Sequence, residues 1–283
     1  MLNKWYDARM LIPIDLPLFL RKAGKGNAEQ MTQRYFIYLS YDGTAYHGWQ
    51  SQPGDNTVQA EVERALSLLL RCAVAVTGAG RTDAGVHARM MVAHFDLDDV
   101  RDAATDTGFF TSQLAYKLNS ILPVDIAVDR VEPVGTDMHA RFSAVSRTYH
   151  YYVHRRKDPF LAAHSLEMTY SELDFDAMNA AAALLLQYND FASFCKSRSD
   201  NKTTLCRVSE ARWVNDGPGR YHFVITADRF LRNMVRAIVG TLLMVGRGKL
   251  SVADFKNVIE RRDRCAAGDS APAHALFLHN IEY

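Results

Sequence analysis

Cysteine is scarce in this sequence, and its four copies form no Cys-x-x-Cys pair. With no such pair and no zinc motif among the histidines, we predict no metal site. A secretory signal is also lacking, which indicates reduced thiols and a cytoplasmic protein. No apolar stretch approaches the roughly 20 residues that a membrane-spanning helix needs, so we expect no contact with a membrane.

An excess of charge is lacking as well. Lysine and arginine total 33 and the acids total 32, which gives a formal net charge of +1. Binding to a nucleic acid would therefore depend on local basic patches rather than on the overall charge. The 283 residues suffice for one large domain or two ordinary ones, and the 48% hydrophobic content is typical of a globular protein.

The most informative stretch is a glycine-rich segment, GAGRTDAGVHA, at residues 78–88. It separates two β-prone runs, 73–77 and 89–95, and its glycines allow a sharp turn close to a ligand. It fits neither a phosphate-binding loop nor a dinucleotide fingerprint. Its central carboxylate, Asp83, has Arg81 two residues away, and an arginine so close would fix its orientation. Such a carboxylate suits a nucleophile or a general base.

A tight turn with a solvated salt bridge is the simpler interpretation of a short Gly-Arg-Thr-Asp string. The whole segment, however, closely resembles the signature of the TruA-type tRNA pseudouridine synthases, Gly-Arg-Thr-Asp-Ala-Gly-Val-His. The aspartate of that signature is the catalytic residue of the family. The resemblance therefore implies that Asp83 is catalytic in this chain.

Further segments resemble the same family, in the same order along the chain. They include YDGTAYHGWQ at 41–50, HARFSA at 139–144, NDFASF at 189–194, MVRAIVG at 234–240 and APAHALFL at 271–278. The resemblance implies that Tyr149 is the active-site tyrosine and that Arg236 points into the active-site cleft. It also places Arg141 near the site and Leu276 beside the target base.

A basic and aromatic stretch lies between Asp137 and Asp158, which enclose no acidic residue. Cations neutralise phosphates and aromatic rings stack on bases, so the mixture suits RNA, although a basic edge strand is an alternative explanation. We also predict a helix over 229–245 with arginines on one face, either solvated or facing RNA, and with Gly240 allowing close approach of another backbone. The predicted RNA-binding cations are Arg141, Arg147, Arg155, Arg156, Lys157, Arg232 and Arg236.

Periodicity predicts the order strand, helix, strand, strand, helix, strand through residue 131, which is the ferredoxin-like order. We therefore predict an α+β fold. By the resemblance it consists of two ferredoxin-like halves that share a mainly antiparallel sheet, with helices on one face and the active-site cleft between the halves. The predicted domains are residues 34–135 and 136–283, preceded at 1–33 by an extension that we expect to be dispensable.

The resemblance implies an isomerase that converts uridines 38, 39 and 40 of the tRNA anticodon arm to pseudouridine, and that acts as a homodimer without a cofactor or metal. Asp83 would attack covalently or remove a sugar proton. Arg81 would take the place of the flipped base and also pair with Asp83. Tyr149 would stack on that base and accept a proton late in the reaction. A catalytically silent RNA-binding protein is the alternative. A glycosidase-like hydrolase is disfavoured because the motifs lack a second acid.

Overall fold

We describe a computed structural model of the chain, which covers residues 32–98, 107–169, 172–196 and 202–283. Most of the predicted N-terminal extension, 1–33, lies outside these ranges. Within the described ranges, every helix is too short or too polar to cross a membrane.

The first half follows the predicted order of elements. It contains β1 (Thr32–Tyr41), α1 (Val58–Leu70), β2 (Thr77–Gly78), β3 (His87–Asp98), α2 (Thr107–Ile121) and β4 (Ile126–Val134). The strand predicted over 73–77 is wrong, because β2 begins only at Thr77. The backbone N–H groups of Val74 and Val76 donate instead to the side chains of Ser67 and Glu63 on α1. These side chains occupy the hydrogen bonds that a longer strand would need.

The second half contains β5 (Ser146–His154), β6 (Leu166–Glu167), α3 (Phe175–Leu184), β7 (Val208–Gly217), β8 (Arg220–Ala227), α4 (Met234–Gly246), α5 (Val252–Arg261) and β9 (Leu276–Glu282). The predicted helix over 229–245 begins later than expected, at Met234. Asn233 has a left-handed backbone with φ 67°, which interrupts the helical path. Arg229 and Arg232 therefore precede α4, and the predicted arginine face is wrong for these two residues.

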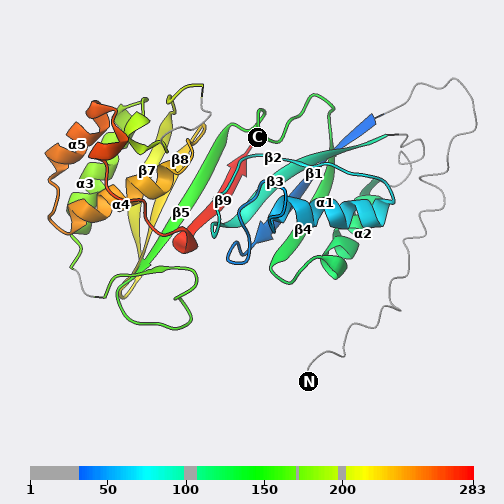
Figure 1. Cartoon of the computed structure of the whole chain (residues 1–283), viewed down its shortest axis with the longest axis horizontal. Helices are drawn as coiled ribbons and strands as arrows, with labels where there is room; N and C mark the ends of the chain where they lie inside the picture. The colour runs from blue at the N-terminus through cyan, green and yellow to red at the C-terminus, as the bar shows by residue number, and fades with distance from the viewer. Residues whose placement is uncertain (1–31, 99–106, 170–171, 197–201) are drawn as a thin grey trace, which may run out of the picture.

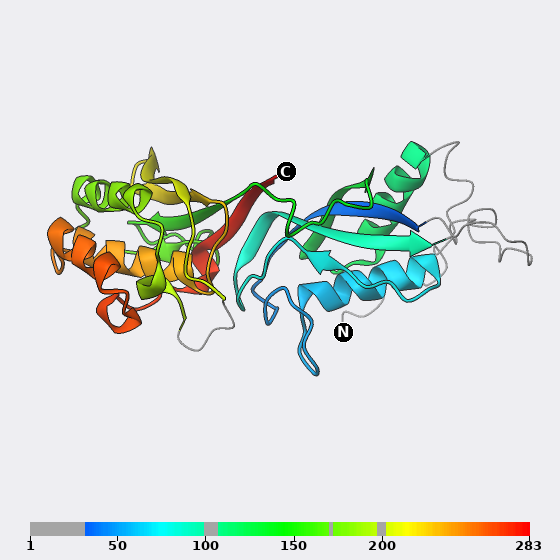
Figure 2. The same ribbon diagram turned by 90° about the horizontal axis from the view of Figure 1, so that it is seen from above.

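The two halves share one sheet, with the strand order β4-β1-β3-β9-β5-β8-β7 (Figure 1). The pairs along this order are antiparallel, except for β3 with β9. The last strand, β9, therefore lies between β3 of the first half and β5 of the second. The molecule is elongated, and the helices gather in two groups at its opposite ends (Figure 2). The predicted α+β fold with a mainly antiparallel sheet is confirmed.

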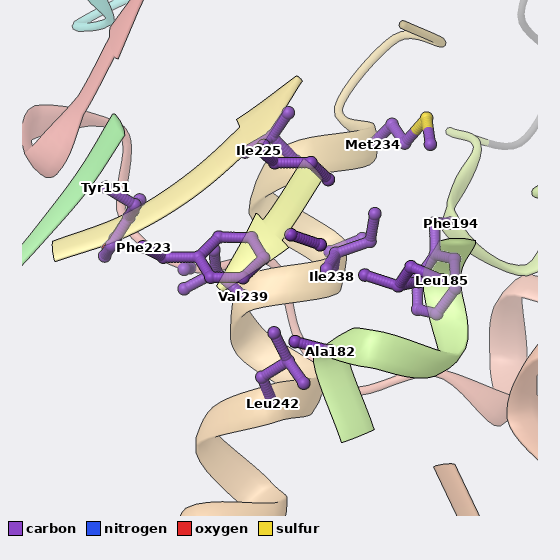
Figure 3. Close-up of a cluster of buried hydrophobic side chains, with 14 of the residues drawn as sticks. Tyr151, Ala182, Leu185, Phe194, Phe223, Ile225, Met234, Ile238, Val239 and Leu242 are labelled. Atoms are coloured by element: carbon purple, nitrogen blue, oxygen red, sulfur yellow. The ribbon is translucent and has the colours of Figure 1, made fainter. Parts of the chain in front are cut away.

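The helices of each half contact one another, α1 with α2 and α3 with both α4 and α5. In the second half, Ile238, Val239 and Leu242 of α4 are fully buried and point toward β8 and α3 (Figure 3). Burial of such aliphatic side chains stabilises a fold by about 1.5–3 kcal/mol each. This packing fixes the position of α4, which carries Arg236 toward the first half.

Gly240 on α4 confirms the predicted close approach of another backbone. A Cβ atom at this position would lie 1.8 Å from the carbonyl oxygen of Asp269. The neighbouring N–H of Ala271 donates to the carbonyl oxygen of Arg236 at 2.9 Å. The segment 269–271 is thus packed directly onto the helix, at the turn that holds Arg236.

We expect Gly240→Ala to destabilise the protein by about 3 kcal/mol or more, because α4 or the segment 269–271 must move to admit the methyl group. Thermal unfolding would measure this as a lower Tm. Gly108→Ala is the matched control, because a Cβ atom at Gly108 meets no atom within 4 Å and this position lies in α2. An equal Tm for the two variants would contradict the packing described here.

A row of histidine rings covers part of the sheet in the second half. His150 of β5 stacks on His279 of β9, with ring centroids 3.7 Å apart and planes 8° apart. On its other side His150 stacks on His222 of β8 at 4.7 Å. Burial, together with the charges that His279 and His222 would carry, lowers the pKa of His150 to about 3. His150 is therefore neutral at physiological pH.

This depressed pKa predicts a loss of stability in mild acid. An unfolded histidine binds a proton below its ordinary pKa of about 6.5, whereas folded His150 does so only near pH 3. The unfolded state therefore gains protons first, and stability falls as the pH drops from about 6.5 toward 3. We expect His150→Phe to lose less stability than the unmodified protein between pH 6.5 and 5, as measured by Tm. Parallel pH curves for the two proteins would contradict this assignment.

Candidate active site

The loop that carries Asp83 runs between β2 and β3 and is shaped by the aromatic loop at 42–50. The N–H of Trp49 donates to the carbonyl oxygen of Thr82 at 3.2 Å, and the Thr82 hydroxyl lies 2.8 Å from that of Tyr41. Gly48 has φ 92°, and a Cβ atom there would lie 2.4 Å from the Thr82 carbonyl oxygen. Only glycine fits this approach, so two of the segments singled out in the sequence hold each other in place.

Asp83 pairs with an arginine from the other half of the molecule. Its Oδ2 lies 3.4 Å from Nη1 of Arg236, and its side chain is 31% exposed. Arg236 is itself fixed, because its Nε donates to the carbonyl oxygen of Ala271 at 2.7 Å. The pairing predicted for Arg81 is not observed. Arg81 is exposed, and within the described residues it forms no hydrogen bond or ion pair.

Tyr149 lies in β5 and belongs to the same site. Its ring packs edge-on against Phe230, with centroids 5.0 Å apart. Burial, with a smaller contribution from the charge of Asp83, raises the pKa of Tyr149 to about 12. The hydroxyl is protonated at neutral pH, so Tyr149 would have to give up its proton before it could act as the predicted proton acceptor. Asp83 from the first half thus pairs with Arg236 of the second, and its charge acts on Tyr149 of the second.

Arg147 does not fit the predicted role in RNA binding. Its guanidinium donates to the main-chain carbonyl oxygens of Ala79, Arg141, Ala144 and Asp228. These bonds use most of the five N–H groups of an arginine, so few remain for a phosphate. Arg147 instead ties the start of the Asp83 loop to the second half. The sequence showed a basic residue here but not the carbonyl groups around it.

The other predicted RNA-binding residues differ in exposure. Arg232, Arg156 and Lys157 are exposed, and Arg155 is half-buried. Arg141 is exposed beside Phe142, with its Cζ 5.9 Å from the centre of that ring, which is itself 78% exposed. Leu276 is only 5% exposed and packs in the core of the second half, so little of its surface can meet a base.

A buried histidine anchors the end of the Asp83 loop. His87 is fully buried, and its Nε2 lies 2.9 Å from the carbonyl oxygen of His274 in the second half. The N–H of Gly43 donates to its Nδ1 at 3.0 Å. Since Nδ1 accepts that bond, Nε2 carries the proton and donates to His274. Burial lowers the pKa of His87, which is consistent with a neutral ring.

Comparison with known proteins identifies the family. The profile of the family described as tRNA pseudouridine synthase matches residues 37–143 and 181–283. The chain belongs to the tRNA pseudouridine synthase family. These enzymes are isomerases, and both matched regions contribute to the site, through Asp83 from the first and Arg236 from the second.

Individual relatives of the chain support the same family assignment. The chain is 56% identical over 253 residues to tRNA pseudouridine synthase A of Porphyromonas gingivalis, which covers 88% of this chain and 97% of the relative. The protein of that name from Bacteroides thetaiotaomicron is also 56% identical, over 89% of this chain and 91% of its own length. That of Bacillus subtilis is 40% identical over 249 residues, with 87% and 97% covered. The resemblance inferred from the motifs is thereby confirmed.

Proposed function

We propose that this protein converts uridines 38, 39 and 40 in the anticodon arm of tRNA to pseudouridine. Membership of the family supports a tRNA substrate, and the relatives are named tRNA pseudouridine synthase A. The observation that carries the proposal is Asp83, which lies within the family signature and is paired with Arg236 where the two halves meet. The uracil must leave C1′, turn and rejoin through C5. No oxidation or phosphoryl transfer is involved, so the proposal requires no cofactor.

The residues of the site have separate roles in this proposal. Asp83 attacks C1′ or removes a proton from the sugar, and an ionised carboxylate held by Arg236 suits either step. The target uridine must leave its base stack at a cost of a few kcal/mol, and the exposed Arg81 fills the place that it vacates. Tyr149 stacks on the flipped base and donates a hydrogen bond. Leu276, which is 5% exposed, adds only a small apolar edge beside the base.

Exposed cations on the second half bind the RNA backbone in this proposal. Arg156 and Lys157 follow β5, Arg232 precedes α4, and Arg141 lies beside the exposed ring of Phe142. Arg155 adds a half-buried charge to the same stretch. Since the whole chain is nearly neutral, these positions concentrate positive charge where tRNA would bind.

We expect the affinity for tRNA to fall steeply with salt, because each neutralised phosphate releases counterions. Replacing both Arg156 and Lys157 by glutamine should weaken binding and reduce the slope of log Kd against log salt by about 2. Lys256→Gln is the control, because Lys256 lies on α5 and already faces Glu260 at 3.8 Å. Binding that is independent of salt, or equal slopes in all three proteins, would contradict this interface.

We also propose that each half is a ferredoxin-like unit and that the cleft between them receives the anticodon arm. The order β1, α1, β2, β3, α2, β4 with strands arranged β4-β1-β3-β2 supports this for the first half. The second half has the corresponding strand arrangement, β9-β5-β8-β7. The corresponding domains are 34–135 and 136–283.

The family resemblance further supports a homodimer that works in the cytoplasm and binds tRNA across both subunits.

A catalytically silent RNA-binding protein on the same scaffold is the alternative, and one experiment separates the two. An unmodified tRNA transcript is incubated with the purified protein, and pseudouridine is mapped along it. We expect pseudouridine at positions 38, 39 and 40 wherever uridine occurs there, and none in a transcript with cytidine at these positions. Tight binding without any pseudouridine would favour the silent protein. Pseudouridine elsewhere would overturn the proposed positions but not the activity.

A further inference from the structure

Three potential metal ligands from distant parts of the chain meet beside the active site. Asp42 follows β1, His87 begins β3, and His164 lies in the loop between β5 and β6. One ligand atom from each lies within 4.8 Å of the other two. Asp42 Oδ2 is 2.7 Å from His164 Nε2, and Asp42 Oδ1 is 3.1 Å from His87 Nδ1. Over the described residues, no other group of three such side chains is as close.

His87 has the surroundings of a metal ligand. Its Nε2–H is bound to the carbonyl oxygen of His274, so the other nitrogen, Nδ1, presents a lone pair. Histidines that bind metals usually make such a bond, which fixes the tautomer and the direction of the ring. The ring is also held by stacking on Phe277, with centroids 4.5 Å apart. His87 is thus already oriented, with Nδ1 toward Asp42.

The contact between Nδ1 and Asp42 is unfavourable as it stands. A lone pair and a carboxylate oxygen 3.1 Å apart are both acceptors, and they repel each other. The N–H of Gly43 occupies the single lone pair of Nδ1, so Nδ1 has no proton to donate to Asp42. A cation between the imidazole and the carboxylate turns this repulsion into attraction. Metal binding would replace the hydrogen bond from Gly43, so we expect moderate rather than very high affinity.

We propose that Asp42, His87 and His164 form a binding site for a divalent transition-metal ion, best fitted by Zn²⁺. Two imidazole nitrogens and one carboxylate oxygen suit this ion. Tetrahedral bonds of about 2.05 Å place neighbouring ligand atoms about 3.3 Å apart. The three ligand atoms already lie within 4.8 Å of one another, so they need to move only a short way to bind one ion. The side chain of His164 is 43% exposed, which gives the ion a route in and leaves a position for water.

Such an ion would link the two halves of the protein. Asp42 and His87 belong to the first half, and His164 belongs to a loop of the second. His87 lies four residues after Asp83 and bonds to the segment just before β9. The ion would therefore hold the Asp83 loop against the second half. Its effect would be on stability and loop position rather than on the reaction itself.

The test uses the full-length protein after removal of metals with EDTA and dialysis. ZnCl₂ is titrated calorimetrically, and Tm is measured with and without zinc. We expect one zinc per chain and a rise in Tm of about 5 °C at zinc a hundredfold above its Kd. His164→Phe and Asp42→Asn should each weaken binding at least tenfold and abolish the rise in Tm. Both readouts are independent of tRNA and of isomerase activity.

Two controls test whether zinc binds at this site and whether the variants fold. His47→Phe removes an exposed imidazole that lies 3.9 Å from a single carboxylate, Asp55, and it should bind zinc like the unmodified protein. Equal Tm values in EDTA for His164→Phe and the unmodified protein show that the variant folds. Absence of stoichiometric binding would overturn the proposal. Unchanged binding in both His164→Phe and Asp42→Asn would also overturn it, by placing zinc elsewhere.

Discussion

Asp83→Asn is expected to abolish pseudouridine formation while tRNA binding changes little. The substitution keeps the size of the side chain but removes the anion that attacks C1′ or takes the sugar proton. Binding survives because many phosphate contacts hold the RNA. Folding survives as well, since an ion pair with a side chain 31% exposed contributes about 1 kcal/mol. The measurements are pseudouridine yield, Kd for tRNA and Tm on the same preparation.

The pattern of the three measurements distinguishes a catalytic Asp83 from a structural one. A structural Asp83 would give a lower Tm with unchanged activity per folded molecule. Substantial activity in a folded Asp83→Asn protein, free of deamidation back to aspartate, would end the catalytic assignment. Arg81→Ala provides a contrast, because we expect it to lower activity and to weaken tRNA binding together.

Arg236→Met is expected to reduce kcat by roughly 30-fold, as the loss of about 2 kcal/mol from a charge-assisted contact implies. Arg236 holds Asp83 through Nη1 and is held in turn by the carbonyl oxygen of Ala271. Without it, Asp83 retains its charge but loses the contact that orients it. Single-turnover kinetics with saturating protein would measure this effect apart from RNA binding.

Arg232→Met is the matched control for Arg236→Met. Arg232 is exposed and lies just before α4, four residues from Arg236. We expect it to raise the Kd for tRNA with little change in the single-turnover rate. If both variants changed only Kd, Arg236 would be an RNA-binding residue and not a residue that orients Asp83.

The sequence predicted the Asp83 loop because its determinants are local. Three glycines, the carboxylate and the flanking strand β3 lie within a short stretch, and each has a recognisable pattern. The start of α1 also depends on a local contact, because the side chain of Thr57 accepts from the N–H of Ala60. Motifs of this kind need no knowledge of the tertiary structure.

The contacts that the site residues make with distant parts of the chain could not be predicted from local sequence patterns. Arg236 lies 153 residues from Asp83, whereas Arg81 lies two residues away and was the natural choice. Only the placement of β9 between β3 and β5 brings α4 to the loop. Asp42, His87 and His164 lie far apart in the sequence and come together only in the fold, so their spacing along the chain shows no metal-binding motif. Arg147 is a basic residue whose role depends on carbonyl groups from three other segments.

Release of tritium from tRNA labelled at C5 of uridine tests the central claim most directly, because C5 must lose its hydrogen when it forms the new glycosidic bond. We predict that the purified protein releases one tritium for each uridine at positions 38, 39 and 40. Asp83→Asn, assayed beside it, should release none. If the folded, tRNA-binding protein released no tritium, the assignment as a working pseudouridine synthase would be contradicted.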